Sequence, residues 1–250
     1  MVQKIPASGL DSQRPFRNLF INGDMSIAQR ATSATGLTGS SYPTIDRMSM
    51  QAASAGTWTQ SQSTDVPTGE GFATSLKMDC TTANGSLSSG SYLIIDQRFE
   101  GQMLQHLKKG TSNSQKVTLS FFVKSAKTGT YIVNIRDDDN TRNISKSYTI
   151  SSADTWEKKV IVFDADTSGA LDNDNAHSMK IIWWLVVGTD RTSGTAATSW
   201  QSSVNANAAV GQTVNLADST SNEFYITGIQ WETDFVTFFE SKTPSEDQIN

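Results

Sequence analysis

The sequence predicts an all-β fold, a β-sandwich with one short helix. Short runs that alternate apolar and polar residues recur between turns rich in Ser, Asn and Gly, which is the pattern of half-buried strands. The composition agrees: 36% of the 250 residues are hydrophobic and 18% are charged, and a chain rich in Ser, Thr, Asn and Gly suits strands joined by many turns. No internal repeat is present, which argues against solenoids and propellers.

The chain begins with a polar segment. Residues 1–17 contain Pro6 and Pro15 and show no periodicity. We expect an extended N-terminal arm, which is either a disordered tail or an anchor that orders against a neighbouring subunit. Residues 18–240 are expected to form one sandwich, and residues 241–250 a polar C-terminal tail.

The first half of the chain contains four alternating runs, and each predicts a strand: 45–50, 57–63, 73–80 and 92–99. In the third run Leu76, Met78 and Cys80 share one face. Cys80 is the single cysteine, so no intrachain disulfide forms, and we expect a small apolar residue on a buried face rather than a nucleophile. Residues 31–44 are rich in Ser, Thr and Gly and are expected to form a loop.

One segment departs from alternation. Met103, Leu104 and Leu107 follow helical spacing within residues 101–109. The sequence therefore predicts one short helix here, closed by Gly110.

The second half contains the clearest alternation, with strands predicted at 117–124, 130–136, 144–150, 157–163, 180–187 and 223–231. Lys127-Thr128-Gly129 resembles a hairpin connection between the first two. The run 180–187 is apolar on both faces, so we expect it to be central or covered on both sides. Residues 188–222 are a long loop, and loops of this length are usually functional or pack on a partner.

Bulk properties exclude several functions. The net charge is -5 and the cations are scattered, so no basic stripe is available for nucleic acid. No run approaches 18 apolar residues, so no membrane insertion is expected. The N-terminus lacks the apolar core of a secretory signal, and we expect synthesis in a cytoplasm.

Catalytic patterns are absent from the sequence. His106 and His177 do not have zinc-ligand spacing, and no GxSxG, GxGxxG or P-loop motif occurs. The chain is therefore expected not to be an enzyme. Paired carboxylates for glycoside hydrolysis remain an alternative, since such pairs can come from distant strands.

Two acidic loops offer oxygen ligands of the kind that calcium prefers. The candidates in residues 137–143 and 164–175 are Asp137, Asp139, Asp172 and Asp174. The spacing is not that of an EF-hand, so these residues are expected to be solvated turn residues, and a calcium site is the alternative. No cofactor is expected, with calcium as the one alternative.

Tryptophans provide candidate platforms for sugar rings. Trp183 and Trp184 are adjacent on a predicted strand, so they face opposite sides and one of them must be core. The other is covered by the long loop, exposed to a ligand or buried at a subunit contact. We take Trp58, Trp184 and Trp200 as candidate glycan-binding residues, with a core or interface role as the alternative.

Several stretches of the chain also resemble a known protein family. The stretch RNLFINGDMSIAQRATS at 17–33 and TIDRM at 44–48 resemble an N-terminal signature of phage tail-fibre and virion-surface proteins, typical of marine phages of cyanobacteria and SAR11-type bacteria. QRFEGQMLQHLKKGTSNSQKVTLSFFVKS at 97–125 and YITGIQWE at 225–232 also resemble the family's series. Ala31 replaces a usual Gly, and Met48 a usual aromatic residue. The matching signature residues are Asn18, Ile21, Asn22, Gly23, Gln29, Arg30, Asp46 and Arg47.

The resemblance implies a jelly-roll sandwich similar to carbohydrate-binding modules. It also implies a place on the virion surface, as a capsid decoration, head fibre or short tail fibre, with other virion proteins as partners and a homotrimer as the first expectation. Host surface glycans are the possible ligand, and a receptor-recognition module of a tail fibre is the alternative. The signature residues are expected to be structural: Asn22-Gly23 as a turn, and Arg30, Asp46 and Arg47 as pairs that fix the N-terminal segment.

Overall fold

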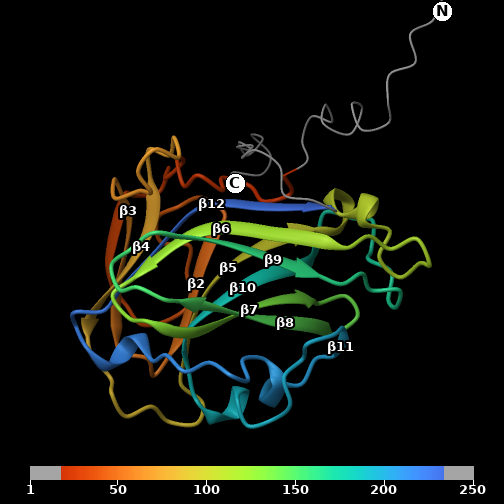
Figure 1. Cartoon of the computed structure of the whole chain (residues 1–250). Coiled ribbons are helices and arrows are strands. Elements are labelled where there is room, and N and C mark those ends of the chain that lie inside the picture. Colours follow the sequence, from red (N-terminus) through yellow and green to blue (C-terminus); the bar gives the residue numbers. More distant parts are fainter. Residues whose placement is uncertain (1–17, 234–250) are drawn as a thin grey trace, which may run out of the picture.

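Residues 18–233, which the computed structural model describes, form two antiparallel sheets packed face to face (Figure 1). Sheet A contains β1 (Ser33–Leu37), β3 (Thr57–Ser63), β4 (Ser75–Thr82), β6 (Val117–Ser125), β9 (Glu157–Phe163) and β12 (Glu223–Thr233). Sheet B contains β2 (Met48–Ala53), β5 (Tyr92–Glu100), β7 (Gly129–Asp137), β8 (Arg142–Ile150), β10 (His177–Val187) and β11 (Gln201–Ser202). The predicted all-β jelly-roll sandwich is confirmed. The predicted arm 1–17 and tail 241–250 lie outside the described residues.

The order of strands within each sheet shows which strands are central and which lie at the edges. Sheet A runs β1-β3-β4-β12-β6-β9, and sheet B runs β11-β8-β7-β10-β5-β2. The apolar run predicted to be central is confirmed, since β10 lies between β5 and β7. The strand predicted from residue 45 begins only at Met48, because Arg47 has a φ of 70°, outside the extended region.

The hairpin predicted at Lys127–Gly129 is wrong. β6 belongs to sheet A and β7 to sheet B, so the connection crosses between the sheets. The turn is held by Tyr131, whose hydroxyl donates to the Lys127 carbonyl at 2.7 Å. Gly129 has a φ of 138° at the crossing. Alternation on both sides of a short turn is common to hairpins and to sandwich crossovers, so the pattern does not separate them.

The predicted short helix is two 3₁₀ turns, η1 (Gly101–Met103) and η2 (Gln105–Leu107). Leu104 and Leu107 are both buried, and their spacing of three matches the three residues per turn of a 3₁₀ helix. Lys108 ends η2 in the left-handed conformation, two residues before the predicted glycine.

One strand escapes the sequence pattern. β1 lies within the predicted loop 31–44 and pairs with β3 at the edge of sheet A. Each of its residues is exposed or only half-buried. An edge strand without a buried face shows no apolar alternation, so only backbone pairing reveals it.

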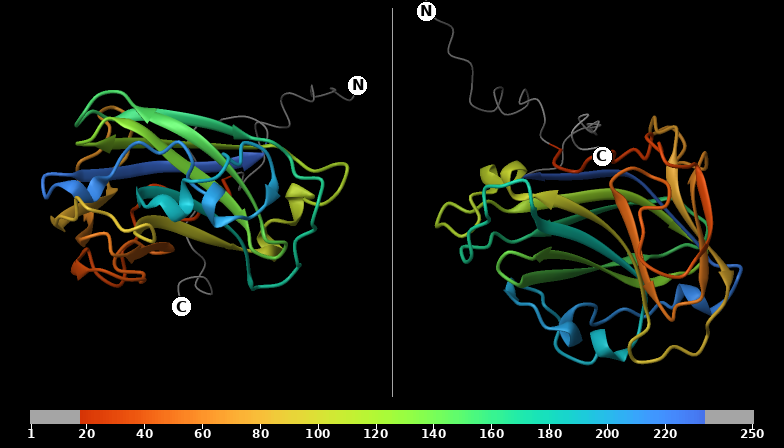
Figure 2. Two further views of the ribbon diagram at one scale, coloured as in Figure 1. Left: turned by 90° about the horizontal axis from the view of Figure 1, so that it is seen from below. Right: turned by 180° about the vertical axis from the view of Figure 1, so that it is seen from behind.

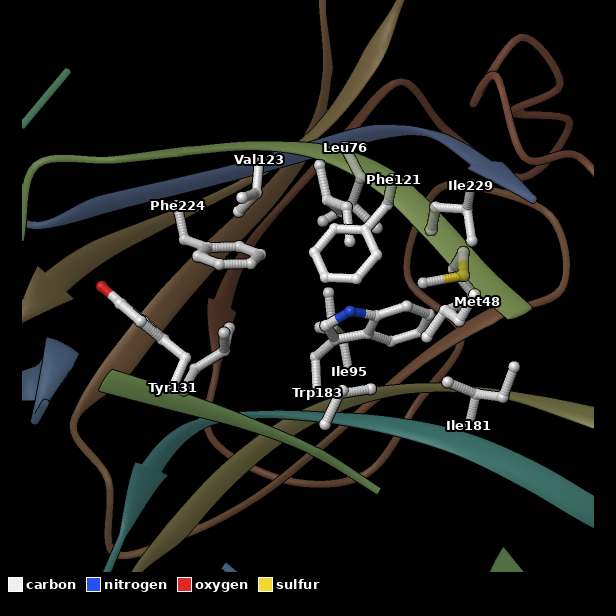
Figure 3. Close-up of a cluster of buried hydrophobic side chains, with 14 of the residues drawn as sticks. Met48, Leu76, Ile95, Phe121, Val123, Tyr131, Ile181, Trp183, Phe224 and Ile229 are labelled. Atoms are coloured by element: carbon white, nitrogen blue, oxygen red, sulfur yellow. The ribbon is translucent and has the colours of Figure 1, made fainter. Parts of the chain in front are cut away.

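The core fills the space between the sheets. Figure 3 shows Trp183 of β10 beneath Phe121 of β6, and the two rings meet edge to face with centroids 5.8 Å apart. Trp183 is fully buried, as is Trp231. The expectation that one of the adjacent tryptophans is core is confirmed, since Trp183 belongs to this cluster while Trp184 belongs to a separate one on the other face.

Most of the segment between β10 and β12 lies over the outer face of sheet B, where Figures 1 and 2 draw it in cyan and blue, and its last part packs into the main core through Val214, Leu216 and Ala217. It contains η3 (Thr189–Arg191), β11, η4 (Asn205–Asn207) and η5 (Leu216–Asp218). Ser145 of β8 fixes it, because its N–H donates to Ala197 O at 2.7 Å and its hydroxyl to Ala208 O at 2.9 Å. Within residues 18–233 no helix has the length and apolar character needed to cross a membrane.

Candidate functional site

The candidate site lies on the outer face of sheet B, where side chains align across the strands. Ile182 of β10 lies opposite Asp96 of β5 and Asn134 of β7. Two residues further along β10, Trp184 lies opposite Ile94. Since alternate residues of a strand share a face, these outward positions follow from the inward placement of Trp183.

A cavity of about 130 Å³ separates this face from the covering segment. Strands supply its floor, and Arg191, Ser203, Asn205 and Ala208 supply the other wall. The strand residues that line it are Gln51, Tyr92, Ile94, Asn134, Arg136, Asn143, Lys180, Ile182 and Trp184. The mixture of aromatic faces with amides and cations is typical of a site that orients a polar ligand.

Two buried polar atoms of this lining have neither a hydrogen-bond nor an ion-pair partner in the described part of the chain. They are the indole Nε1 of Trp184 and the side-chain Oδ1 of Asn143. Trp184 is 5% exposed and Asn143 is 1% exposed. Leaving a buried donor or acceptor unpaired costs about 1–3 kcal/mol, so a ligand that pairs with both atoms recovers that free energy.

Arg191 holds the aromatic end of the cavity. Its guanidinium stacks over the Tyr92 ring at 4.2 Å and lies 6.0 Å from the Trp184 ring. Its Nη1 donates to the Gly90 carbonyl at 3.3 Å. The covering segment is thus tied to the strand face next to the two rings, and its position sets the width of the cavity.

At the opposite end of the cavity, the carboxylate of Asp138 pairs with three basic side chains. Lys180 Nζ lies 3.0 Å from its Oδ2, His177 Nε2 lies 2.8 Å from the same oxygen, and Arg136 Nε lies 2.7 Å from Oδ1. Burial acts to raise the pKa of Asp138, but the hydrogen bond from His177 and the charges of Lys180 and Arg136 outweigh it and hold the pKa well below its usual range. Asp138 is therefore an anion that organises the surrounding cations.

Of the three tryptophans chosen from the sequence, only Trp184 lines this cavity. The choice of Trp58 is wrong, because this side chain is fully buried and its N–H is bonded to Ala55 O at 2.7 Å. Trp200 lies elsewhere, with its N–H on Asp164 O at 2.7 Å and Lys109 Nζ over its ring at 5.2 Å.

Sequence reasoning did not find Tyr92, Arg191 or the asparagines of this cavity. Asn134 and Asn143 are ordinary polar residues in alternating strands, and only the register makes them part of a site, since Asn134 lies opposite Ile182 and Asn143 lies opposite Arg136 at the cationic end of the cavity. The one available signal was the run 180–187, whose second apolar face requires a cover. That signal indicates the covered face but names no residue on the neighbouring strands.

The signature residues form a strap, residues 18–30, that closes one end of the sandwich. Asn18 bridges its own turn to β12, since its Oδ1 accepts from Phe20 N and Trp231 N, each at 2.9 Å. Asn22 adopts a φ of 57° and its side chain bonds to both backbone groups of Ile27. The expectation of a structural turn holds, but the left-handed residue is Asn22, not the glycine.

Gly23 is required for a different reason. A Cβ placed there would lie 2.1 Å from the Ile229 carbonyl oxygen, and Gly23 O accepts from Ile229 N at 2.9 Å. Only a residue without a side chain allows this approach of strap to strand.

The predicted charge pairs are present in altered form. Asp46 Oδ1 accepts from Gln29 N at 3.3 Å and lies 3.8 Å from Arg30 Nη1. Arg47 instead contacts Glu100 of β5, with Nη2 2.8 Å from Oε1. Asp46 thus fixes the strap, while Arg47 fixes the start of β2 to its neighbour.

The calcium candidates lie in two loops that the fold does bring together, since Asp172 N donates to Asp139 Oδ2 at 3.0 Å. Asp174 accepts from Ala176 N at 3.0 Å. Asp137 is fully buried and faces Lys109, whose Nζ lies 2.5 Å from Asp137 Oδ2. Among the described residues no group of three or more metal-ligating side chains is present.

The cysteine has the predicted structural character. Cys80 is 1% exposed and belongs to the main core. Burial and the nearby charge of Asp79 raise the pKa of its thiol, so the reactive thiolate is disfavoured.

Comparison with known proteins found similar solved structures but no matching family model. No protein-family model matches the sequence, and no curated protein matches it. Among solved structures, the enzymatically active domain of tailspike protein 4 from bacteriophage CBA120 is 14% identical, with a TM-score of 0.43, over 88% of this chain and 22% of that one.

Carbohydrate-binding modules are also similar in structure. The family 11 module of the cellulosomal cellulase Lic26A-Cel5E of Clostridium thermocellum is 13% identical with a TM-score of 0.35, over 87% of this chain and 96% of that one. TmCBM61, solved with β-1,4-galactotriose, is 9% identical with a TM-score of 0.36, over 87% of this chain and 99% of that one.

Proposed function

We propose that this chain is a carbohydrate-binding protein and that the cavity on the outer face of sheet B is its binding site. The observation that carries the proposal is a cavity with two aromatic rings at one end and two unpartnered polar atoms in its lining, one at the aromatic end and one at the cationic end. Trp184 Nε1 is a donor and Asn143 Oδ1 an acceptor, both buried in the lining. A sugar presents hydroxyl groups that donate and accept, together with C–H faces that pack on aromatic rings.

Binding without hydrolysis fits the lining better than catalysis. Hydrolysis of glycosides ordinarily requires two carboxyl groups flanking the bond. Among the described residues that line the cavity, none is Asp or Glu. The nearby Asp138 is held by three basic side chains, so it is poorly suited to donate or take up a proton near neutral pH.

A glycan array probed with the full chain tests the proposal, followed by titration of the selected glycans. The informative variant is Trp184→Phe, which keeps an aromatic face and removes the indole donor. Loss of one hydrogen bond predicts about three- to tenfold weaker binding. Trp156→Phe is the matched control, because Trp156 Nε1 is already bonded to Asp65 Oδ1 at 2.9 Å near the outer face of sheet A. Equal affinity in wild type and Trp184→Phe would contradict the assignment of the site.

We further propose that the protein acts on the surface of a phage particle, as a capsid decoration, head fibre or short tail fibre. The resemblance of residues 17–48, 97–125 and 225–232 to virion-surface proteins supports this. Glycan binding then serves host attachment. A homotrimer is the proposed assembly, and sedimentation equilibrium would give three times the 27.2 kDa chain mass.

Quantitative mass spectrometry of purified particles tests the location. A copy number near that of the major capsid protein supports a decoration, and a few copies per particle support a tail fibre. Complete absence from particles contradicts the virion proposal and leaves the glycan proposal intact.

A further inference from the structure

Three cationic residues stand side by side across the outer face of sheet B. Arg98 of β5 lies opposite Lys180 of β10, and Lys180 lies opposite Arg136 of β7. Like charges directly opposite on neighbouring strands destabilise a sheet. A row of three therefore requires negative charge from elsewhere on this face or from a ligand.

The face supplies only part of that charge. Asp138 is shared by Lys180, Arg136 and His177. The Nε of Arg98 is buried without a hydrogen-bond partner in the described part of the chain. One carboxylate thus serves two permanent cations and a histidine, and the third cation of the row lacks a partner at Nε.

The other carboxylates of this face are already engaged. Asp96 accepts hydrogen bonds from Ser49 Oγ and Gln51 Nε2 and is fully buried. Glu100 pairs with Arg47 at 2.8 Å. Neither is free to neutralise the cationic row.

The lining of the cavity also contains more cationic than anionic side chains. Arg136, Lys180 and Arg191 line it, and the described lining residues include no carboxylate. The chain as a whole carries a net charge of -5, so a positive cavity is a local departure from the general surface. Such a cavity concentrates anions and stabilises them by charge-assisted hydrogen bonds.

We infer that the cavity selects an acidic saccharide, one whose ring carries a carboxylate or sulfate group. The inference rests on the proposed function and names its ligand class. The sugar ring packs at the Trp184 and Tyr92 end, and its anionic group lies toward Lys180 and Arg136. The volume of about 130 Å³ is below the roughly 300–1,000 Å³ of sites that enclose a drug-sized ligand, so one sugar unit enters while the rest of the glycan stays outside.

The test compares matched ligands by calorimetric titration of the full chain. The probes are galacturonic acid oligosaccharides, the same oligosaccharides as neutral methyl esters, and sulfated and desulfated carrageenan oligosaccharides. We expect the acid to bind at least about tenfold more tightly than its ester, because the ester loses the charge-assisted contact. Tighter binding of only the sulfated carrageenan would identify sulfate as the recognised group. Added salt should weaken the acidic ligand selectively.

Single substitutions test whether Lys180 and Arg136 cause the preference for an acidic ligand. Lys180→Gln and Arg136→Gln should each weaken the acidic ligand at least about tenfold and should weaken the neutral ligand by a smaller factor. Lys77→Gln is the control, since Lys77 lies on sheet A, paired with Glu223 at 2.6 Å. Thermal melting of each variant verifies that the fold is intact.

The outcomes separate the two proposals. Equal affinity for each acid and its neutral counterpart overturns the selectivity and leaves glycan binding standing. If Lys77→Gln abolishes binding of the acidic ligand while Lys180→Gln still binds it, the assigned site is overturned. Failure of every saccharide on the array and in titration overturns both proposals.

Discussion

At the scale of single residues, Lys109 stands out because it acts as an internal cation. Its Nζ lies 2.5 Å from Asp137 Oδ2, 3.1 Å from Asp166 Oδ2, 3.0 Å from Ser168 O and 2.8 Å from Gly169 O. Lys109, Asp137 and Asp166 are each less than one-tenth exposed. The ammonium therefore joins the two acidic loops by the same oxygen contacts that a bound cation would make.

Replacing Lys109 should lower the free energy of unfolding substantially. Lys109→Met leaves Asp137 and Asp166 buried with less compensation, and breaking a buried pair costs about 3–5 kcal/mol. Urea unfolding measures the loss. Lys116→Met is the control, because Lys116 and Asp164 are more than half exposed and such pairs contribute about 0–1 kcal/mol. A loss at Lys109 no larger than that of the control would contradict the assigned role.

The same site predicts a gain of metal binding. Lys109→Ala leaves two carboxylates and two carbonyl oxygens around an empty position, a donor set that suits Ca²⁺. We expect millimolar Ca²⁺ to raise the urea midpoint of this variant and to leave the wild type nearly unchanged. An identical response of the two proteins would show that the oxygens do not form a cation site.

At the scale of elements, the strap shows how local sequence closes the sandwich. Asn18, Asn22 and Gly23 each use backbone contacts to β12 or to the strap itself. The family resemblance pointed to these residues from the sequence, but their partners could not be predicted, because Ile229 and Trp231 lie more than 200 residues away.

Gly23→Ala tests the strap. The new Cβ would meet Ile229 O at 2.1 Å, so the strap must move and its bond to β12 breaks. We expect a loss of about 2 kcal/mol or more, the range of changes that strain a close backbone approach. Gly39→Ala is the control, since nothing lies within 4 Å of its Cβ and its φ is not positive. Equal melting temperatures of the two variants would contradict a close contact at the strap.

The bounds of β3 and β9 match the predicted runs 57–63 and 157–163, and in both strands residues on one side are more buried than those on the other. The pairing of strands into sheets could not be predicted from the sequence. The β6–β7 connection looked like a hairpin, and the exposed β1 looked like a loop. Alternation reports which face is buried, whereas sheet order depends on contacts between distant strands.

At the scale of the whole molecule, stabilising carboxylates lie in separate places, Asp166 in the loop between β9 and β10 and Glu223 on β12. Burial acts to raise the pKa of Asp166, but its bonds from Arg142 and Lys109 outweigh burial and lower the pKa. The pKa of Glu223 on β12 is lowered in the same way, where Lys77 and Tyr225 outweigh burial.

These lowered pKa values make the stability of the fold depend on pH. A carboxyl whose pKa is lower in the folded state binds fewer protons folded than unfolded, so its stabilisation is complete above the unfolded pKa of about 4 and is lost as pH falls further. We expect the urea midpoint to fall as pH is lowered below about 4.5. Asp166→Asn should reduce the slope of that fall; an unchanged slope would show that Asp166 does not contribute.

The candidate site was only partly predictable for a related reason. Trp184 followed from its position beside a core residue, but the cavity exists because a long segment crosses back over β5, β7 and β10. Its polar members become a site only through that long-range arrangement.

The measurement that tests glycan binding at this cavity most directly is a crystal structure of the full chain with a glycan selected by the array. We expect a sugar ring in the cavity on the outer face of sheet B, packed at the Trp184 and Tyr92 end and within hydrogen-bond distance of Trp184 Nε1. A glycan bound on the outer face of sheet A, with this cavity unchanged, would contradict the proposed site.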